Sequence, residues 1–280
     1  MIQDSHPPSQ YLTGKYKREH TPCIQNFECE EFHALDPPSH RQSNLHVTLR
    51  LCLVTSKIEH MGEYKPSKQI IAHRGFWLNA SDANSKDALQ QALEYGFGIE
   101  TDLRARCGQV VVSHDLPTRN SPIFSDLVNN WTRLGILDNQ TIALNIKEDG
   151  LIPLLIGNME IEKLIKSFFF DMSVPEMLAY LKFGLPVASR LSEFEVLSNN
   201  LTDKMGATRN YWLDSFYSDW WLDNEAVDEL CATSEVTLVS PEIHGRNPDQ
   251  AWDWFAEKVS TGCRINLCTD LPLRVLRRIT

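Results

Sequence analysis

The sequence lacks several features that would assign it to a particular class of protein. It has no long uncharged apolar run, and the best membrane-segment candidate, Leu45–Val54, is short and contains Arg50. No basic cluster offsets the net charge of −10, which argues against nucleic-acid binding. The 7 cysteines form no CxxC pair and no metal-binding spacing with histidines, so we expect reduced structural thiols. Because the N-terminus also shows no signal-peptide pattern, we expect a cytoplasmic protein without a transmembrane segment.

The first 67 residues differ from the rest of the chain. They contain two proline pairs, Pro7–Pro8 and Pro37–Pro38, and no helical or strand periodicity. This composition is typical of a disordered or irregular segment. We therefore expect an N-terminal extension over residues 1–67 and one folded domain over residues 68–280.

Strand-like and helix-like runs alternate through the predicted domain. Short β-branched runs bounded by turn residues predict strands, and apolar residues spaced three and four apart predict helices. The expected strands are 69–72, 98–103, 109–113, 141–147, 168–172, 186–191, 211–216, 237–242 and 265–270. The expected helices are 85–95, 123–134, 151–166, 175–183, 225–233 and 249–259.

This alternation predicts an α/β fold in which helices cover a parallel sheet. About eight such units in about 210 residues fit a (β/α)₈ TIM barrel, with the extra run 109–113 pairing back onto 98–103. An open doubly wound sheet is the alternative, although no glycine-rich phosphate loop follows the first strand.

Charged residues gather where the first expected strands end. His73 and Arg74 follow the first strand, while Glu100 and Asp102 lie two residues apart on the second and therefore point to one face. Two such carboxylates need a bound cation, a shared proton or basic partners, and a hard divalent cation fits best. His73 and His114 can each exchange a proton near neutral pH. Acid, base, cation and arginine together are the groups that hydrolyse a phosphodiester.

Three linked motifs resemble those of the glycerophosphodiester phosphodiesterase family, part of the PLC-like phosphodiesterases. They are HRG at His73–Gly75, E-x-D at Glu100–Asp102 and HD at His114–Asp115, in matching order and spacing. A helix opening near Asn84–Ser85 stands where that family has ENS or ENT, with Ala83 at the glutamate position. The resemblance implies a TIM barrel that hydrolyses a small-molecule phosphodiester with the help of Mg²⁺ or Ca²⁺.

The resemblance implies catalytic roles for four residues. His73 and His114 would act as general acid and base, in an order that the sequence does not assign. Arg74 and Lys147 would contact phosphate oxygens. The alternatives are that Arg74 forms an ion pair with the E-x-D carboxylates and that Lys147 is a buried counter-ion.

The implied metal ligands are Glu100, Asp102 and Asn145. Asn145 stands in LNIK at 144–147, where the family's LEIK strand has a glutamate. Its amide oxygen can bind a hard cation but adds no charge, so affinity should fall unless Asp171 or Glu242 completes the shell.

Later segments depart further from the family pattern. Loops after the last strands of such barrels often bind phosphate, which makes His244 and Arg246 candidate substrate-binding residues. Arg190, at the end of an earlier strand, is a further candidate. We expect Asp270 to be structural and to tie the last strand to the first. The aromatic-rich run 211–221 either packs between barrel and helices or lines an apolar mouth for an acyl or ring-bearing substrate.

The leading interpretation is a metal-dependent phosphodiesterase that releases an alcohol and leaves a phosphomonoester. Two alternatives stay open. One is a phospholipase or lyase of the same superfamily that forms a cyclic phosphate by internal attack. The other is a non-catalytic barrel that binds a phosphorylated ligand, which Ala83 and Asn145 keep possible.

Overall fold

The computed structural model describes residues 69–137, 140–158, 166–196, 199–205, 210–222 and 225–280. All of them belong to one compact unit, Glu63–Thr280. The predicted extension over residues 1–67 lies outside the described residues.

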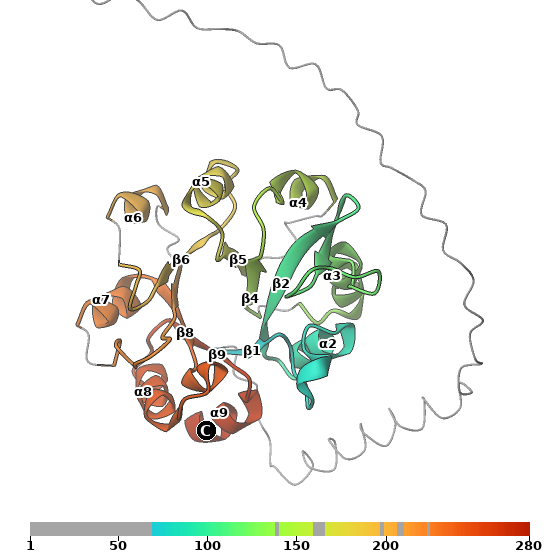
Figure 1. Cartoon of the computed structure of the whole chain (residues 1–280). Coiled ribbons are helices and arrows are strands. Elements are labelled where there is room, and N and C mark those ends of the chain that lie inside the picture. Colours follow the sequence, from blue (N-terminus) through green and yellow to red (C-terminus); the bar gives the residue numbers. More distant parts are fainter. Residues whose placement is uncertain (1–68, 138–139, 159–165, 197–198, 206–209, 223–224) are drawn as a thin grey trace, which may run out of the picture. The chain divides into compact units, whose positions relative to one another are not determined.

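The described strands form a single sheet that curls into a nearly closed barrel (Figure 1). Its strand order is β5-β4-β2-β1-β9-β8-β7-β6, with every neighbouring pair parallel. The bounds are β1 Ile70–His73, β2 Gly98–Arg106, β4 Ile142–Ile146, β5 Ser167–Phe170, β6 Ala188–Leu191, β7 Asn210–Leu213, β8 Glu235–Val239 and β9 Ile265–Thr269. A parallel bridge between Phe169 and Val187 joins the two edges of the sheet. The predicted (β/α)₈ barrel is therefore confirmed, and the open doubly wound sheet is wrong.

The extra strand β3 (Gln109–Val112) pairs antiparallel with β2, as predicted. The hairpin turns at Cys107 and Gly108, whose φ angles of +50° and +76° suit the tight turn between twisted strands. β3 then returns the chain to the level of Leu103. As a result, His114 comes back to the carboxyl ends of the barrel strands.

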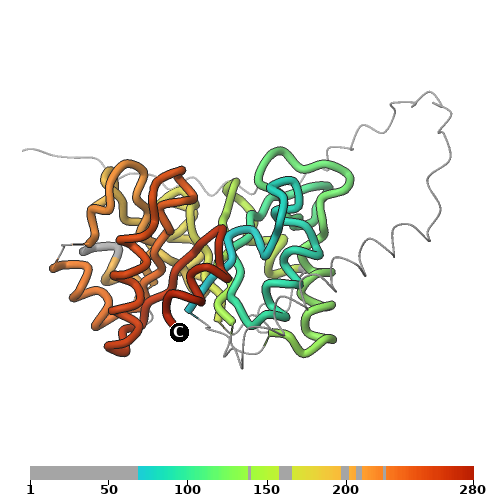
Figure 2. The backbone as a smooth tube through the Cα atoms, turned by 90° about the horizontal axis from the view of Figure 1, so that it is seen from below, coloured from blue at the N-terminus to red at the C-terminus, as the bar shows by residue number. Residues whose placement is uncertain are grey.

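Helices surround the barrel (Figure 1). Their bounds are α2 Lys86–Glu94, α3 Phe124–Leu134, α4 Ile152–Asn158, α5 Val174–Lys182, α6 Asn199–Met205, α7 Glu225–Thr233, α8 Asp249–Ser260 and α9 Pro272–Ile279, with short 3₁₀ turns η1 Ala80–Asp82 and η3 Pro241–His244. Ser85 and Ser173 cap α2 and α5 by accepting backbone N–H groups, which explains where those helices begin. The final helix α9, which the sequence analysis did not predict, packs against β1 (Figure 2). None of the described helices combines the length and apolar character needed to cross a bilayer.

Apolar side chains fill two layers. The larger layer lies between strands and helices and buries Trp131, Tyr180 and Phe255. The smaller layer lies inside the barrel and consists of Ile71, Ala143, Phe168, Phe170, Ala188, Trp212, Val239 and Cys268. Phe170 and Trp212 stack with centroids 4.0 Å apart. This inner layer forms an apolar floor beneath the polar residues at the carboxyl ends.

Gly75 lies in the turn that follows β1. Its φ is +90°, and an added Cβ would lie 2.6 Å from the carbonyl carbon of Ala88 in α2. Only glycine allows helix α2 to approach the turn that holds His73 and Arg74 so closely.

We predict that Gly75→Ala lowers the free energy of unfolding by about 3 kcal/mol or more. A left-handed alanine costs about 1 kcal/mol, and the backbone clash adds the rest. Urea unfolding followed by circular dichroism measures the loss. Gly135→Ala is the matched control, because Gly135 has φ +67° but nothing within 4 Å of an added Cβ. Equal losses in the two variants would contradict this account of the turn.

Candidate active site

A cavity of about 540 Å³ opens at the carboxyl ends of the barrel strands. Its polar lining comes from nearly every strand end around the ring: His73, Arg74, Glu100, His114, Asn145, Lys147, Asp171, Arg190, Asp214, His244 and Asp270. Most residues selected from the sequence therefore meet in one place. Asp102, Arg246 and Glu242 do not line the cavity.

The strand register explains this convergence. His73 on β1 pairs with Glu100 on β2, and Asp102 on β2 pairs with Asn145 on β4. In-register parallel neighbours point to the same side, so these side chains all face the barrel interior. Their position above the apolar inner layer places them at the cavity floor.

Glu100 is a buried carboxylate with little compensation. It is 1% exposed, its Oε2 accepts a hydrogen bond from the backbone N–H of Arg74 at 3.3 Å, and His73 Nε2 lies 3.8 Å away. Burial raises the pKa of Glu100 to about 7, and the neighbouring Asp102 charge adds to this, whereas His73, Lys147 and Arg74 oppose it. The carboxylate therefore lacks a strong positive partner in this environment.

Asp102, by contrast, has two cationic side chains beside it, although Arg74 Nε and Asp102 Oδ1 are both buried without a hydrogen-bond partner among the described residues. Lys147 Nζ lies 3.1 Å from its Oδ1, and Arg74 Nε lies 3.1 Å from its Oδ2. The amide of Asn84 donates to the same Oδ2 at 2.7 Å. Thus the ion-pair and counter-ion alternatives for Arg74 and Lys147 are both observed, although both side chains also reach the cavity surface.

Asn84 is a structural contributor that the sequence analysis missed. Besides holding Asp102, its side-chain oxygen accepts a hydrogen bond from Thr101 Oγ1 at 2.8 Å, and its backbone N–H donates to the carbonyl of Arg74. Arg74 itself adopts φ +56°, a left-handed conformation that costs free energy and needs such support. The available signal was the position of Asn84 directly before Ser85, the N-cap of α2.

His73 is oriented by Asp270. Its Nδ1 lies 2.7 Å from Asp270 Oδ1, because β9 runs parallel to β1 and carries Asp270 beside it. Asp270 therefore ties the last strand to the first, as expected. The link is its contact with the His73 imidazole, which lines the cavity. Burial alone would lower the pKa of His73, yet the hydrogen bond to Asp270 and the Glu100 charge raise it above the ordinary value.

His114 sits in a more open position. Its side chain is 45% exposed, and its Nδ1 lies 2.9 Å from Oδ1 of Asp115, which is itself 94% exposed. It lines the same cavity as His73. The cavity is therefore lined by two imidazoles, the more buried His73 and the more exposed His114.

A third part of the cavity wall consists of linked polar side chains from β4 to β6. Asn145 Nδ2 donates a hydrogen bond to Asp171 at 3.2 Å. The guanidinium of Arg190 donates one hydrogen bond to Asp171 at 2.5 Å and two to Glu195 at 2.8 and 3.0 Å. The side-chain oxygen of Asn145 is buried and has no hydrogen-bond partner among the described residues.

The remaining wall holds a second histidine–aspartate pair. His244 Nε2 lies 2.7 Å from Asp214 Oδ1, and both residues line the cavity. Arg246, predicted to bind substrate, instead bonds Asp219 and Ser215 at 2.7 to 2.8 Å, outside the cavity lining. Glu242, considered as a completing ligand, accepts hydrogen bonds from Ser240, Thr269 and the backbone of Asp270 and does not line the cavity either.

The donor set fits one hard cation. Within the described residues no group of three or more His, Cys, Asp and Glu side chains could hold a metal. However, the uncompensated Glu100 carboxylate and the unpaired Asn145 oxygen are both ligands that Mg²⁺ and Ca²⁺ accept. Asp102 adds negative charge behind them, already balanced by Arg74 and Lys147.

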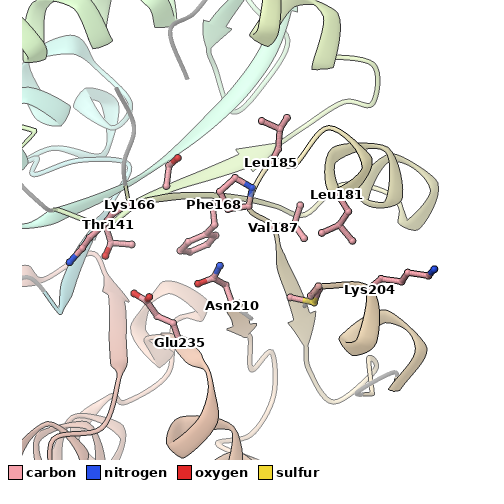
Figure 3. A pocket seen from close by; sticks show the side chains of 13 residues that line it. Thr141, Lys166, Phe168, Leu181, Leu185, Val187, Lys204, Asn210 and Glu235 are labelled. Atoms are coloured by element: carbon pink, nitrogen blue, oxygen red, sulfur yellow. The ribbon is translucent and has the colours of Figure 1, made fainter. Parts of the chain in front are cut away.

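A second cavity, of about 400 Å³, lies at the amino ends of the strands (Figure 3). It combines apolar Phe168, Leu185 and Val187 with Lys204 and Glu235. No residue that the sequence analysis selected for chemistry lines it. The candidate active site is therefore the cavity at the carboxyl ends.

Two solved structures resemble this barrel. A solved glycerophosphoryl diester phosphodiesterase from Parabacteroides distasonis ATCC 8503 is 15% identical, with a TM-score of 0.54 over 75% of this chain and 85% of that one. A glycerophosphodiester phosphodiesterase from Agrobacterium tumefaciens str. C58 is 16% identical, with a TM-score of 0.48 over 76% and 99%. No protein-family model and no curated protein sequence matches the chain. At this identity the first likeness establishes the barrel fold.

The ion pair at the cavity edge predicts a pH-dependent stability. Burial raises the pKa of Glu195, but hydrogen bonds from Arg190 and Ser192 hold it below its ordinary value. A depressed folded-state pKa stabilises the fold above the unfolded value of about 4.3, and the gain disappears as pH falls through the folded value.

We therefore predict that Glu195→Gln lowers Tm by about 2 °C at pH 7 and not at pH 3, a modest effect because the pair is partly exposed. Calorimetry across this range measures it. Glu229→Gln, on the exposed face of α7, is the control and should leave the pH profile of Tm unchanged. A constant offset for Glu195→Gln at all pH values would refute the assignment.

Proposed function

We propose that this chain is a divergent member of the glycerophosphodiester phosphodiesterase family. It hydrolyses a small-molecule phosphodiester to an alcohol and a phosphomonoester. The observation that carries the proposal is the convergence of two imidazoles, Arg74, Lys147 and Glu100 on one cavity at the carboxyl end of the barrel. The likeness to the Parabacteroides structure supports the same reaction class.

Arg74 and Lys147 bind the phosphate in this proposal. Their side chains are 27% and 20% exposed, so each reaches the cavity while one of its atoms contacts Asp102. Asp102 thus fixes the two cations in place, and their remaining N–H groups are available to phosphate oxygens. Preorganised charge of this kind stabilises the additional negative charge of the transition state.

The two histidines divide the proton transfers. One imidazole accepts a proton from the attacking water as a new P–O bond forms, and the other donates a proton to the leaving oxygen as the old P–O bond breaks. Asp270 fixes the His73 ring through Nδ1, which leaves Nε2 to face the reacting atoms. His114 provides the second group from the loop after β3.

Glu100 and Asn145 are the residues that would hold Mg²⁺ or Ca²⁺, with Asp102 contributing charge. When bound, such a cation polarises a phosphoryl oxygen as a Lewis acid. Its affinity is expected to be low, because an amide stands where a third carboxylate would add charge.

One observation favours a second candidate, a barrel that binds a phosphorylated ligand without turnover. Asp102 is already neutralised by Arg74 and Lys147, so the cavity can hold a phosphate without any cation.

The direct test is turnover of a glycerophosphodiester and of an aryl phosphodiester by the full chain, with and without Mg²⁺ or Ca²⁺. We predict that His73→Asn lowers kcat by about 10²- to 10⁴-fold while circular dichroism shows an unchanged fold. Phosphorus NMR identifies the product. A cyclic phosphate would favour internal attack, and ligand binding without turnover, unaffected by His73→Asn, would favour the non-catalytic candidate.

The cation site gives a separate prediction. Asn145→Glu should raise the affinity for Mg²⁺ or Ca²⁺ about tenfold or more, because a charged ligand replaces a neutral one, whereas Asn145→Ala should weaken it. Calorimetric titration of the two variants and the wild type measures the change. Identical isotherms for all three proteins would remove Asn145 from the site.

A further inference from the structure

An aromatic cluster continues the active-site cavity outward to the protein surface. Phe216 lines the cavity, and its ring centroid lies 5.1 Å from the His244 imidazole. Phe194 lies 6.2 Å from Phe216 and 6.0 Å from Tyr217. Phe194 and Tyr217 are 70% and 77% exposed. An apolar path therefore leads from a half-buried histidine to solvent.

These rings differ from the other aromatic residues of the same segment. Tyr211 and Trp221 are 1% and 0% exposed, and Trp212, 5% exposed, belongs to the layer inside the barrel, where it also forms part of the cavity floor. Those side chains serve packing, which was one of the two roles that the sequence left open. Phe216 and Tyr217 are packed less tightly, because Phe216 is only half-buried where it lines the cavity and Tyr217 is 77% exposed. Exposed apolar side chains gathered beside a cavity are typical of a binding surface.

The loops that present the cluster are held together. Both Oε atoms of Glu193, on the loop after β6, accept backbone N–H groups of Phe216, Tyr217 and Ser218, on the loop after β7, at 3.1, 2.9 and 3.0 Å. Ser192 and Glu195 exchange two backbone hydrogen bonds around Phe194. The rings are thus preorganised, which lowers the entropic cost of binding a ligand on them.

The inner end of the path is polar. Asp214, 8% exposed, holds Nε2 of His244, so the other ring nitrogen is left for a ligand. In the strand order of the barrel, β7 lies opposite β2, so this wall faces the one that carries Glu100 and the phosphate-binding cations. A molecule that spans the cavity meets cations at one wall and aromatic rings at the other. Such a molecule is amphiphilic.

We infer that Phe194, Phe216 and Tyr217 form a subsite for an apolar substituent on one ester group of the phosphodiester substrate, an acyl chain or an aromatic ring. The inference rests on the proposed function and narrows its substrate class. His244, held by Asp214, contacts the polar linkage between the phosphorus and this substituent.

The test compares three substrates on the full chain: a glycerophosphodiester, the same diester with one hexanoyl chain at a concentration where it is monomeric, and an aryl phosphodiester. The double variant Phe194→Ala/Tyr217→Ala removes the exposed rings. We expect the ratio of kcat/KM for the hexanoyl to the unacylated diester to fall about tenfold, through loss of apolar contact. If the kcat/KM ratio of the aryl to the unacylated diester falls equally, the subsite accepts aromatic rings as well as acyl chains. If only one of the two ratios falls, the substrate concerned carries the substituent that the subsite binds.

Leu178→Ala/Phe183→Ala is the matched control, because it removes two exposed apolar side chains, 45% and 59% exposed, from α5 and its C-cap. It should leave both ratios unchanged. Unchanged ratios in the Phe194→Ala/Tyr217→Ala variant, with normal turnover of all three diesters, would overturn the subsite and leave the proposed function standing.

Binding of a dialkyl phosphinate that carries one hexyl chain separates the two claims, because its two P–C bonds cannot be hydrolysed and its single negative charge matches that of a phosphodiester. Calorimetry should show about tenfold weaker binding to Phe194→Ala/Tyr217→Ala than to the wild type or the α5 control. If the wild type turns over no diester but this difference is found, the subsite stands and the proposed function fails. Equal binding to all three proteins overturns the subsite.

Discussion

Two carboxylates buried side by side on β2 determine how the carboxyl end of this barrel is built. Glu100 and Asp102 are 1% and 0% exposed, and a buried charge left unpaired costs several kcal/mol. Asp102 is compensated by contacts with Arg74, Lys147 and Asn84. These partners come from the turn after β1, the end of β4 and the residue before the α2 cap. Their contacts with Asp102 therefore hold three separate segments against β2. One of these segments is the left-handed turn at Arg74, which Gly75 makes possible.

The negative charges of the two carboxylates are compensated to different degrees. Asp102 has two cationic side chains at 3.1 Å and one amide donor, whereas Glu100 has one backbone N–H and a histidine 3.8 Å away. Beside them the Asn145 oxygen is buried without a partner. Oxygen atoms of two residues that line the same cavity thus have few partners, and a cation would find complementary charge there. The proposed phosphate-binding role of Arg74 and Lys147 is compatible with their observed role as counter-ions, because both side chains contact Asp102 and also line the cavity.

Local patterns in the sequence predicted much of this. Short β-branched runs identified the barrel strands, including β3 and its return to β2, and the HRG, E-x-D and HD motifs identified most of the cavity floor. Contacts between distant segments were beyond such patterns. Asp270 reaches His73 across 197 residues, only because barrel closure brings β9 beside β1. Arg246 follows the left-handed Gly245 and is turned away to Asp219, which no periodicity reveals. The polar sequence of α6 gave no apolar period to recognise.

The central claim is that Glu100 and Asn145 hold a cation next to a phosphate bound by Arg74 and Lys147. Crystals of the protein soaked with Mn²⁺ and a phosphomonoester test it directly, because anomalous scattering locates the metal without assumptions about its ligands. The account predicts one anomalous peak bonded to the Glu100 carboxylate and the Asn145 oxygen, with phosphate on the two cationic side chains. A phosphate bound in the cavity with no metal at Glu100, or a metal bound elsewhere, would contradict it.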